Sequence, residues 1–577
     1  MRKIFLICFL SLAMIGCGDG GSNDNAEYEE PSLTIDKTIT LSISANILKM
    51  SFLVDNEVSN PQFVVLEGPK EGNVTLLDNE SGRFSYLTSS SKNDSFVYVV
   101  SDGNGTSYNI KVNLSNTHIP IMTNNGIQED FNTSLPSVIE GKELVNFSSN
   151  LPVMVIDMGD QEILDDPKIP GTITLFEPGE DNRTRLNSMP THIGYMEIEM
   201  RGSSSQYYYP KKQYGMDTVL TDGEDDDVVL LGMPKEHKWI LQAPYGDKSL
   251  MRNYLAYHKT RQIDESKYYA VRSKYIELLT RVGDQYRYDG IYVFMEKIKR
   301  DGDRLDIAKL TDEDVQYPEI TGGYILKKDG TPDPEEFSFH TTFGTTITVS
   351  YPEDEDLNSD QEYYIENYIQ ELEKALRSDD FNVTDSANYY GNWIDEGSFI
   401  VHILSREFFM DVDTWLFSEY FHKDKDQNLA MTPVWDFNTG MGNNDYRFVG
   451  RSDIWVYEYL RTDEGKENSS LRYWVERLMS DPAFRQKTQT KWKELRRGIW
   501  SDANLSSFIA STQSELSEAA ERNFERWPNV LGVYVWPNRQ ACEDGGTPIY
   551  CPTFDRAVNE HLRSWLLERA TWIDDNL

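Results

Sequence analysis

Residues 399–438 read FIVHILSREFFMDVDTWLFSEYFHKDKDQNLAMTPVWDFN. The apolar positions from Phe399 to Phe409 have helical spacing and predict an amphipathic helix that ends at the acidic loop Met410–Asp413. A short strand, a polar turn and a returning strand are predicted over residues 419–434. The return strand leads into Trp435-Asp436-Phe437-Asn438, so a helix, an acidic loop, a hairpin and a second acid follow one another.

The same order of elements is found in protein kinases. There the first Asp orients the attacking hydroxyl, and the second Asp holds the metal on the nucleotide phosphates. Asp436 follows Asp413 by 23 positions, which is near the usual kinase interval. Pairs of Asp in loops are also common without catalysis, so a structural role is the alternative interpretation.

Two earlier segments carry further candidate residues. Residues 195–218 predict a strand, a small-residue turn at Arg201–Ser205, and a second strand that carries Lys211 and Lys212. Small residues let backbone N–H groups approach phosphate oxygens, and cationic side chains add donors. Taken alone, this segment is more simply explained as an ordinary hairpin.

The second of these segments, residues 239–257, predicts a strand and a turn into a helix. Asp247 is placed to cap that helix, with Ser249 sharing the role. Arg252 and Asn253 fall in its first turns, where we expect them to support the structure.

Taken in order, these segments resemble the spore-coat-protein-H (CotH) kinase family, an atypical branch of the protein-kinase-like fold. A helical tail with Arg522-Asn523-Phe524 and Trp527-Pro528 fits the same family. The blocks that carry the resemblance are Arg201–Ser205 with Pro210–Lys212, Asp247–Asn253, Met295–Ile298, Gly322–Leu326, Asp411–Asp413 and Trp435–Asn438.

The resemblance implies a role for each matching residue. Asp413 would be the catalytic Asp and Asp436 the metal ligand, with ATP and Mg²⁺ or Mn²⁺ as cofactors. Two positions depart from the family pattern, since Asn438 replaces a usual Asp and Asp411 replaces a common Asn beside the metal. The implied cofactor-binding residues are Arg201, Ser203, Ser204, Lys211 and Lys212 at the phosphates, and Glu296 and Lys297 at the hinge by the adenine.

Three functions are consistent with these motifs. The first is an atypical protein kinase that transfers the ATP γ-phosphate to Ser or Thr of surface or periplasmic proteins. The alternative is a non-catalytic cell-surface adhesion or carbohydrate-associated binding protein on a degenerate kinase-like fold, for which a surface glycan is the partner. A metal-dependent hydrolase is a third reading, but the motif region offers no His-rich ligand set.

The N-terminus has the features of an exported lipoprotein. Arg2 and Lys3 precede an apolar stretch of about a dozen residues, which is too short to span a bilayer and predicts a signal peptide over residues 1–16. Gly16-Cys17 resembles a lipobox, which implies lipid on Cys17 and a membrane-anchored protein in the periplasm or at the cell surface. An ordinary cleaved signal with an incidental cysteine is the alternative.

The rest of the chain predicts a multidomain protein. After a polar tether over residues 17–31, residues 32–117 alternate as short strands and resemble bacterial cadherin-like repeats, so we expect an all-β sandwich there. Asp94 and Asp102 could bind calcium, although a turn role is favoured. A linker at 118–148 precedes an α+β kinase-like domain at 149–577, with helices expected over 363–376, 470–526 and 559–572.

Charge and cysteine content limit the partners and the compartment. The formal net charge is −39, and such an acidic surface repels phosphate backbones, so nucleic acid is excluded as a partner. Of the four cysteines, Cys8 leaves with the signal peptide and Cys17 would carry the lipid. Cys542 and Cys551 remain, and in an oxidising compartment we expect them to form a local disulfide.

Overall fold

The computed structural model describes residues 33–43, 47–51, 62–78, 83–88, 93–101, 106–116 and 147–577, apart from short gaps at 160, 187, 283–284, 331–335, 354–355 and 463–469. The expected signal peptide, Cys17, the tether and nearly all of the expected linker lie outside these residues. Within the described ranges, no helix is both long enough and apolar enough to cross a membrane.

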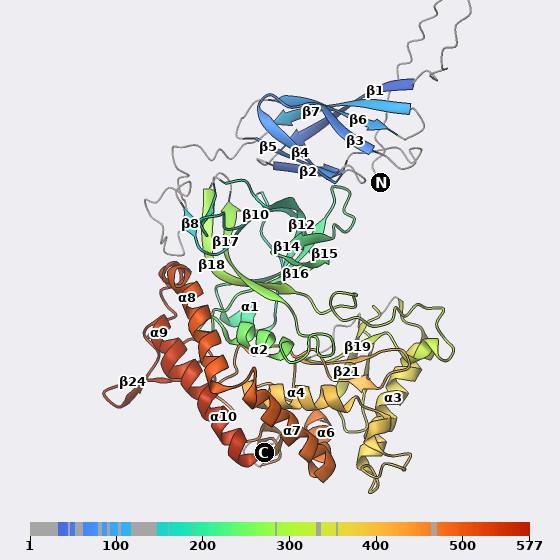
Figure 1. The fold of residues 1–577 in the computed structure, drawn as a ribbon, viewed down its shortest axis with the longest axis vertical. Helices are drawn as coiled ribbons and strands as arrows, with labels where there is room; N and C mark the ends of the chain where they lie inside the picture. Colours follow the sequence, from blue (N-terminus) through green and yellow to red (C-terminus); the bar gives the residue numbers. More distant parts are fainter. Residues whose placement is uncertain are drawn as a thin grey trace, which may run out of the picture.

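The N-terminal domain is all β, as predicted (Figure 1). A four-stranded sheet has the order β1-β7-β6-β3, and a three-stranded sheet has the order β2-β5-β4. The first strand pairs in parallel with the last, with Leu33 opposite Thr106. The strands are β1 (Leu33–Ile43), β2 (Ile47–Ser51), β3 (Gln62–Glu67), β4 (Gly72–Asp78), β5 (Arg83–Thr88), β6 (Asp94–Ser101) and β7 (Thr106–Asn116).

Asp94 links separate segments of this domain through hydrogen bonds. Its carboxylate accepts hydrogen bonds of 2.8 Å from the backbone N–H groups of Lys70 and Glu71 and from the Tyr86 hydroxyl. These contacts tie the start of β6 to the turn between β3 and β4, which is the role favoured from the sequence. Asp102, the other residue considered for calcium, lies outside the described residues.

A closed seven-stranded barrel follows, in the order β10-β12-β13-β16-β18-β17-β9. Alternation along the strands separates an apolar interior from a polar outer face, as in Tyr195-Met-Glu-Ile-Glu-Met200, where Met196 and Ile198 are fully buried. The barrel strands are β9 (Val153–Asp157), β10 (Ile169–Phe176), β12 (His192–Arg201), β13 (Gln213–Val219), β16 (Lys238–Gln242), β17 (Ser273–Val282) and β18 (Gln285–Glu296).

The C-terminal part combines a small sheet with helices, drawn in yellow to red in Figure 1. The five-stranded sheet has the order β20-β21-β19-β22-β23. Its strands are β19 (Tyr324–Lys328), β20 (Ser338–His340), β21 (Thr346–Tyr351), β22 (Glu419–Lys423) and β23 (Leu429–Ala430). Three two-stranded pairs complete the β structure: β8 (Ser148–Ser149) with β11 (Thr184–Arg185), β14 (Val228–Leu230) with β15 (Met233–Glu236), and β24 (Cys542–Asp544) with β25 (Thr547–Ile549).

The predicted helices are present, with breaks that local chemistry explains. The span 470–526 divides where Asp481 caps a new helix that begins at Pro482, and again before the Ser501 cap. The helices are α1 (Ser204–Tyr208), α2 (Arg252–Arg261), α3 (Ser359–Arg377), α4 (Glu396–Phe409), α5 (Val456–Tyr459), α6 (Ser470–Ser480), α7 (Pro482–Arg497), α8 (Asp502–Arg526), α9 (Phe554–Arg556) and α10 (Ser564–Asn576), with a π-helical segment at Ala557–Arg563.

Two local predictions are wrong. The turn at Arg201–Ser205 is not a simple hairpin, because the chain forms the short helix α1 there, and Lys211 and Lys212 precede β13 rather than lie on it. Helix α4 is not amphipathic, since every residue from Ser398 to Phe409 is buried. The helices packed against α4 include α2, α7 and α10, so the polar side chains that suggested a solvent face bond inside the protein.

Candidate functional site

The end of α4 places the first pair of acids. The helix stops at Met410, which has a left-handed backbone (φ 47°), and the chain turns directly into Asp411 and Asp413. Asp411 is buried and ties two loops together: one carboxylate oxygen accepts the Asp413 N–H at 3.0 Å, and the other accepts the Thr439 N–H at 3.1 Å and its hydroxyl at 2.7 Å. Asp411 therefore sets the relative position of both acidic loops.

The backbone around Asp436 is held in an uncommon conformation. Asp436 has a backbone φ of 57°, a region that residues other than glycine rarely adopt. Strained backbone of this kind is concentrated at functional sites. Its N–H donates to the Tyr257 hydroxyl at 3.1 Å, and the next N–H, of Phe437, donates to Asn253 Oδ1 at 2.6 Å. The Asn438 N–H donates to the Asp436 carboxylate. Helix α2 thus fixes the direction of Asp436.

The three carboxylates lie in one electrostatic field. Burial raises the pKa of Asp411 to about 8, and the neighbouring Asp413 and Asp436 add to the increase. Burial and Asp413 likewise raise the pKa of Asp436 to about 6. The pKa of Asp413 is raised by burial, although Arg447 Nη1, 2.8 Å from its carboxylate, opposes the shift. Carboxyl groups that are close together and have raised pKa values favour a bound cation, because the cation stabilises their ionised forms.

Among the predicted cofactor residues, Arg201 contacts the residue that precedes Asp436. Its guanidinium carbon is 5.9 Å from the centre of the Trp435 ring, one residue before Asp436. The pKa of Lys297 is lowered to about 8 by burial and by Lys238 and Lys168, and Arg201 also contributes. Ser203 and Ser204 are exposed at the start of α1. Arg201 therefore supplies positive charge next to Trp435, at the start of the second acidic loop.

Lys211, Lys212 and Glu296 have internal partners instead. Lys211 Nζ donates to the Ile291 carbonyl at 2.5 Å and to Asn523 Oδ1 at 2.9 Å. Lys212 Nζ donates to the carbonyls of Gln206 and Tyr209.

The Glu296 carboxylate is buried and accepts bonds from the Tyr269 hydroxyl and from Arg272. In this conformation, no contact joins any of these three side chains to the acidic loops within the described residues.

Arg252 and Asn253 have the structural role predicted for them, and the segment Asp247–Asn253 supports the second acidic loop. Asp247 accepts the N–H groups of Ser249 and Arg252, each at 2.9 Å, although the residue just before α2 is Met251. Arg252 is buried and its Nε donates to the Gly440 carbonyl at 3.0 Å. This segment thus holds the chain on both sides of Phe437.

Sequence reasoning missed Arg406, Arg447 and Tyr257 at the site. Arg406 is fully buried, pairs with Glu419 at 2.9 Å, and donates to the Trp435 carbonyl at 2.7 Å. An Arg inside an otherwise apolar helix was a usable signal, because a buried guanidinium needs a partner. Neither Arg447 nor Tyr257 belongs to a local sequence pattern that would indicate a role at the site.

An aromatic stack extends from the surface towards this site. Tyr207 is 84% exposed and meets Tyr208 edge-on, and Tyr208 stacks on Trp536 with centroids 4.3 Å apart. Trp536 also stacks on Tyr446 at 6.1 Å, and Tyr446 precedes the Arg447 that pairs with Asp413. Exposed rings next to a polar site are a surface on which sugar rings or planar groups can stack.

At the far C-terminal end, Cys542 and Cys551 form a disulfide across the β24–β25 pair. Both sulfur-bearing side chains are buried against Ala557.

Comparison with known proteins defines the family. The model of the CotH kinase protein family matches residues 198–573, which is most of the chain. The chain belongs to the CotH kinase protein family. A bacterial Ig domain matches residues 23–115, in agreement with the N-terminal sheets. A search among curated proteins finds no match.

One similar solved structure is an endo-fucoidan hydrolase from glycoside hydrolase family 107, at 11% identity and a TM-score of 0.13. The match covers 32% of the CotH chain and 26% of the hydrolase chain. A TM-score this low assigns neither a fold nor an activity. Family membership of the CotH domain therefore rests on the sequence match over residues 198–573.

Proposed function

We propose that the protein is an atypical protein kinase that transfers the γ-phosphate of ATP to Ser or Thr residues of surface or periplasmic proteins. The main support is that Asp411 hydrogen-bonds both acidic loops and that Asp413 lies close enough to add to the raised pKa of both Asp411 and Asp436. Membership of the CotH kinase protein family points to the same chemistry. We further propose that lipid on Cys17 anchors the protein outside the cytoplasm.

Asp413 is the residue best placed to orient an acceptor hydroxyl. Its side chain is 34% exposed, so a substrate can reach it, whereas Asp411 is buried and committed to Thr439. The Arg447 contact favours the ionised form of Asp413, which accepts the hydrogen bond of a Ser or Thr hydroxyl. Arg201 and Lys297 add positive charge for the nucleotide phosphates.

We propose Asp436 as the principal ligand of a divalent cation. Mg²⁺ and Mn²⁺ prefer oxygen ligands, and Asp436 offers a half-buried carboxylate whose pKa is raised by its acidic neighbours. Asn438 could add an amide oxygen, and Asp411 would have to give up part of its bonding to Thr439. A bound cation would neutralise charge on the transferred phosphoryl group. With Asn438 in place of an acid, this proposal needs only one metal.

The test is phosphate transfer by the purified protein from γ-labelled ATP, with Mg²⁺ or Mn²⁺, to Ser- or Thr-containing acceptors. Asp436→Asn and Asp413→Asn should each reduce labelling at least about a hundredfold. The matched control is Asp453→Asn, which removes an exposed carboxylate paired only locally with Arg451. Retained melting temperatures would show that the variants fold, and undiminished labelling by Asp436→Asn would refute the proposal.

The aromatic stack supports a second candidate, a carbohydrate-binding protein on the same fold. Tyr207, Tyr208 and Trp536 offer ring faces of the kind that hold sugars by stacking. The two functions differ in which ligand stabilises the protein, because a ligand bound to the folded state raises the melting temperature. A response to ATP with metal supports the kinase. A response to polysaccharide alone, lost in Tyr208→Ala and kept in Tyr363→Ala, supports the binding protein.

A further inference from the structure

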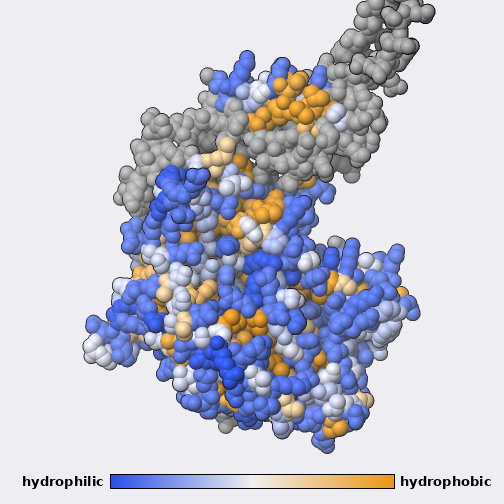
Figure 2. All heavy atoms as spheres, in the orientation of Figure 1, coloured by the Kyte–Doolittle hydropathy of each residue, from blue (hydrophilic) through white to orange (hydrophobic). Residues whose placement is uncertain are grey.

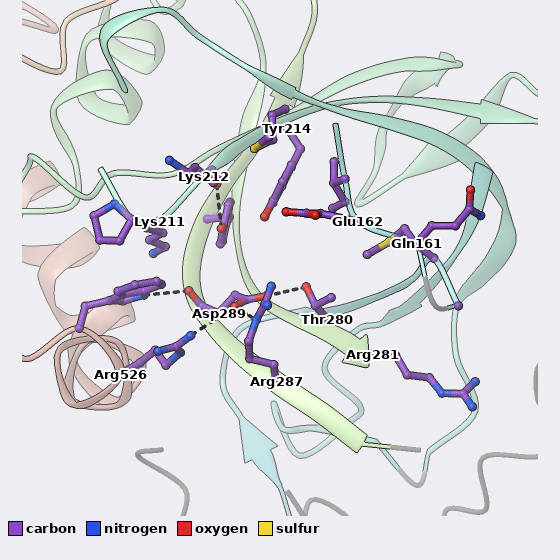
Figure 3. Close-up of a pocket in the computed structure, with 17 residues that line it drawn as sticks. Gln161, Glu162, Lys211, Lys212, Tyr214, Thr280, Arg281, Arg287, Asp289 and Arg526 are labelled. Atoms are coloured by element: carbon purple, nitrogen blue, oxygen red, sulfur yellow. Dashed lines mark hydrogen bonds and ion pairs between the residues drawn. The ribbon is translucent and has the colours of Figure 1, made fainter. Parts of the chain in front are cut away.

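A cavity of about 530 Å³ opens at the mouth of the barrel, within the size range of small-molecule sites (Figure 3). Its walls come from the loop after β9, the residues that lead into β13, strands β17 and β18, and the C-terminal end of α8. The charged residues that line it are Glu162, Lys211, Lys212, Arg281, Arg287, Asp289 and Arg526. Cations therefore outnumber acids there, although the whole chain has a net charge of −39.

The charges of several of these cations are not matched by bonded carboxylates. The hydrogen bonds of Lys211 and Lys212 go to carbonyl and amide oxygens, which are neutral. Arg287 and Arg281, in contrast, are paired with Asp289 and Asp157, each at 2.7 Å. Burial lowers the pKa of Lys211 well below its usual range, and an anion bound in the cavity would favour the charged form of this amine.

Arg526 is the clearest case. It is only 1% exposed, and its Nε donates to the Tyr288 carbonyl at 2.7 Å. Nη1 and Nη2 have no hydrogen-bond partner in the part of the chain that the structure describes, and Asp289 Oδ1 is 3.9 Å from Nη2. In Figure 3 the guanidinium points towards Asp289 and Arg287 at the cavity wall. Two buried N–H₂ groups are therefore available for an acceptor.

The cavity lies on the other face of the barrel wall from the acidic site. Met200 and Tyr214 line the cavity, whereas the next residue of β12, Arg201, approaches Trp435. Successive side chains of a strand point to opposite faces, so β12 sends one side chain to each site. The cavity is thus a second location and not an extension of the acidic centre.

We propose that this cavity binds a small ring-bearing molecule with a phosphate or carboxylate group, such as a sugar phosphate or a uronic acid. The anionic group would lie against Lys211, Arg287 and Arg526, the cations of the cavity wall. Tyr214 and Tyr292 stack with centroids 6.2 Å apart and 15° between their planes, and with Trp527 they form an aromatic side for the ring. This proposal does not depend on kinase activity.

Isothermal titration calorimetry on the purified protein tests whether the cavity binds such an anion, with glucose 6-phosphate, glucuronate and neutral glucose as probes. We expect at least one of the two anions to bind with a Kd below about 1 mM, and glucose not to bind. Whichever anion binds identifies the group as phosphate or carboxylate. Arg526→Gln and Lys211→Met should each weaken binding at least about tenfold, because each removes a wall cation.

Surface variants keep the test decisive if those buried variants fail to fold. Glu162 is exposed on the cavity rim, so Glu162→Gln removes a repulsive charge and should tighten anion binding several-fold. Glu180→Gln, an exposed change on the same barrel outside the cavity, should leave the Kd unchanged. Asp436→Asn should also leave it unchanged, because the acidic site is separate. No binding of either anion, equal binding of glucose, or no response to Glu162→Gln would overturn the proposal.

Discussion

At the scale of single residues, hydrogen bonds to backbone N–H groups of the two loops fix the positions of the acidic side chains at the candidate site. Asp436 keeps its left-handed conformation because Tyr257 and Asn253 accept two consecutive N–H groups around it. Asp411 performs the matching task for the other loop through Thr439. The acids can then be held close to one another although burial and the nearby Asp413 raise the pKa of Asp411 and Asp436.

Asn253→Ala tests this support. The change leaves the buried Phe437 N–H without its acceptor, which should lower the free energy of unfolding by about 1–3 kcal/mol and reduce phosphate transfer through a displaced Asp436. Urea denaturation and labelling with γ-labelled ATP measure the two effects. Asn504→Ala, at an exposed position on α8, should change stability by less than about 0.5 kcal/mol. Equal effects of both changes would contradict the supporting role.

His258 on α2 gives a pH prediction. Burial lowers its pKa to about 4, below the ordinary value of 6.5, so the unfolded state binds more protons between these values. The contribution of His258 to the free energy of unfolding is therefore fully present above pH 6.5 and is lost as the pH falls towards 4, where the unfolded state gains a proton that the folded state does not. His258→Gln should remove about 1–2 kcal/mol of the stability difference between pH 7 and pH 5. Urea unfolding at both pH values measures it, and an unchanged difference would show that His258 is not buried as described.

At the scale of elements, α4 is the central helix of the C-terminal part. All its residues from Ser398 onward are buried, and three of them carry charge or titrate: His402, Arg406 and Glu407. Glu419 is the first residue of β22, and its carboxylate lies 2.7 Å from His402 Nε2 and 2.9 Å from Arg406 Nε. Glu407 instead accepts the indole N–H of Trp415 and the N–H groups at the start of α5. The helix is therefore fixed by polar contacts in several directions.

Arg569 joins α10 to this helix. Its Nη2 lies 3.4 Å from the Glu407 carboxylate, and both residues are fully buried. Arg569→Met should lower the free energy of unfolding by about 3–5 kcal/mol, because it leaves a buried carboxylate without its cation. Adding Glu407→Gln should recover part of the loss. Arg563→Met, at an exposed position before α10, is the control, and denaturant unfolding that ranks it level with Arg569→Met would contradict this account.

At the scale of the whole molecule, acidic charge is the dominant surface property. The net charge is −39, and the face in Figure 2 is mostly hydrophilic with separate apolar patches. Like charges spread over a folded surface repel one another and favour expansion of the chain. The lining of the barrel cavity, by contrast, has more basic than acidic residues.

Salt should therefore stabilise the protein. Raising NaCl from about 20 to about 300 mM shortens the Debye length from roughly 20 to roughly 6 Å and screens the repulsion. We expect the melting temperature at pH 7 to rise by roughly 1–4 °C. At a pH near the calculated isoelectric point of 4.6, the same salt step should have little effect. A rise of equal size at both pH values would exclude charge repulsion as the cause.

Most element types, the family and the two acidic loops could be predicted from the sequence alone, whereas the short helix α1 and the fully buried surroundings of α4 could not. Helical periods, turn residues and six ordered motifs are local properties, so they can be identified without coordinates. They located α3, α4, the β22–β23 hairpin, Asp413 and Asp436. They also indicated that Arg252 and Asn253 would support structure, which their contacts with Gly440 and Phe437 confirm.

Only the tertiary structure decided which of these residues meet. Closure of the barrel depends on pairing between β9 and β17, which are far apart in the chain and leave no local pattern. Alternation along β12 and β13 then sends Arg201 towards the acids and places Tyr214 in the cavity, with Lys211 at its wall. Lys211 and Lys212, although adjacent to a motif in sequence, therefore line a different site in space, because the chain between α1 and β13 runs along the cavity and not along the acidic loops.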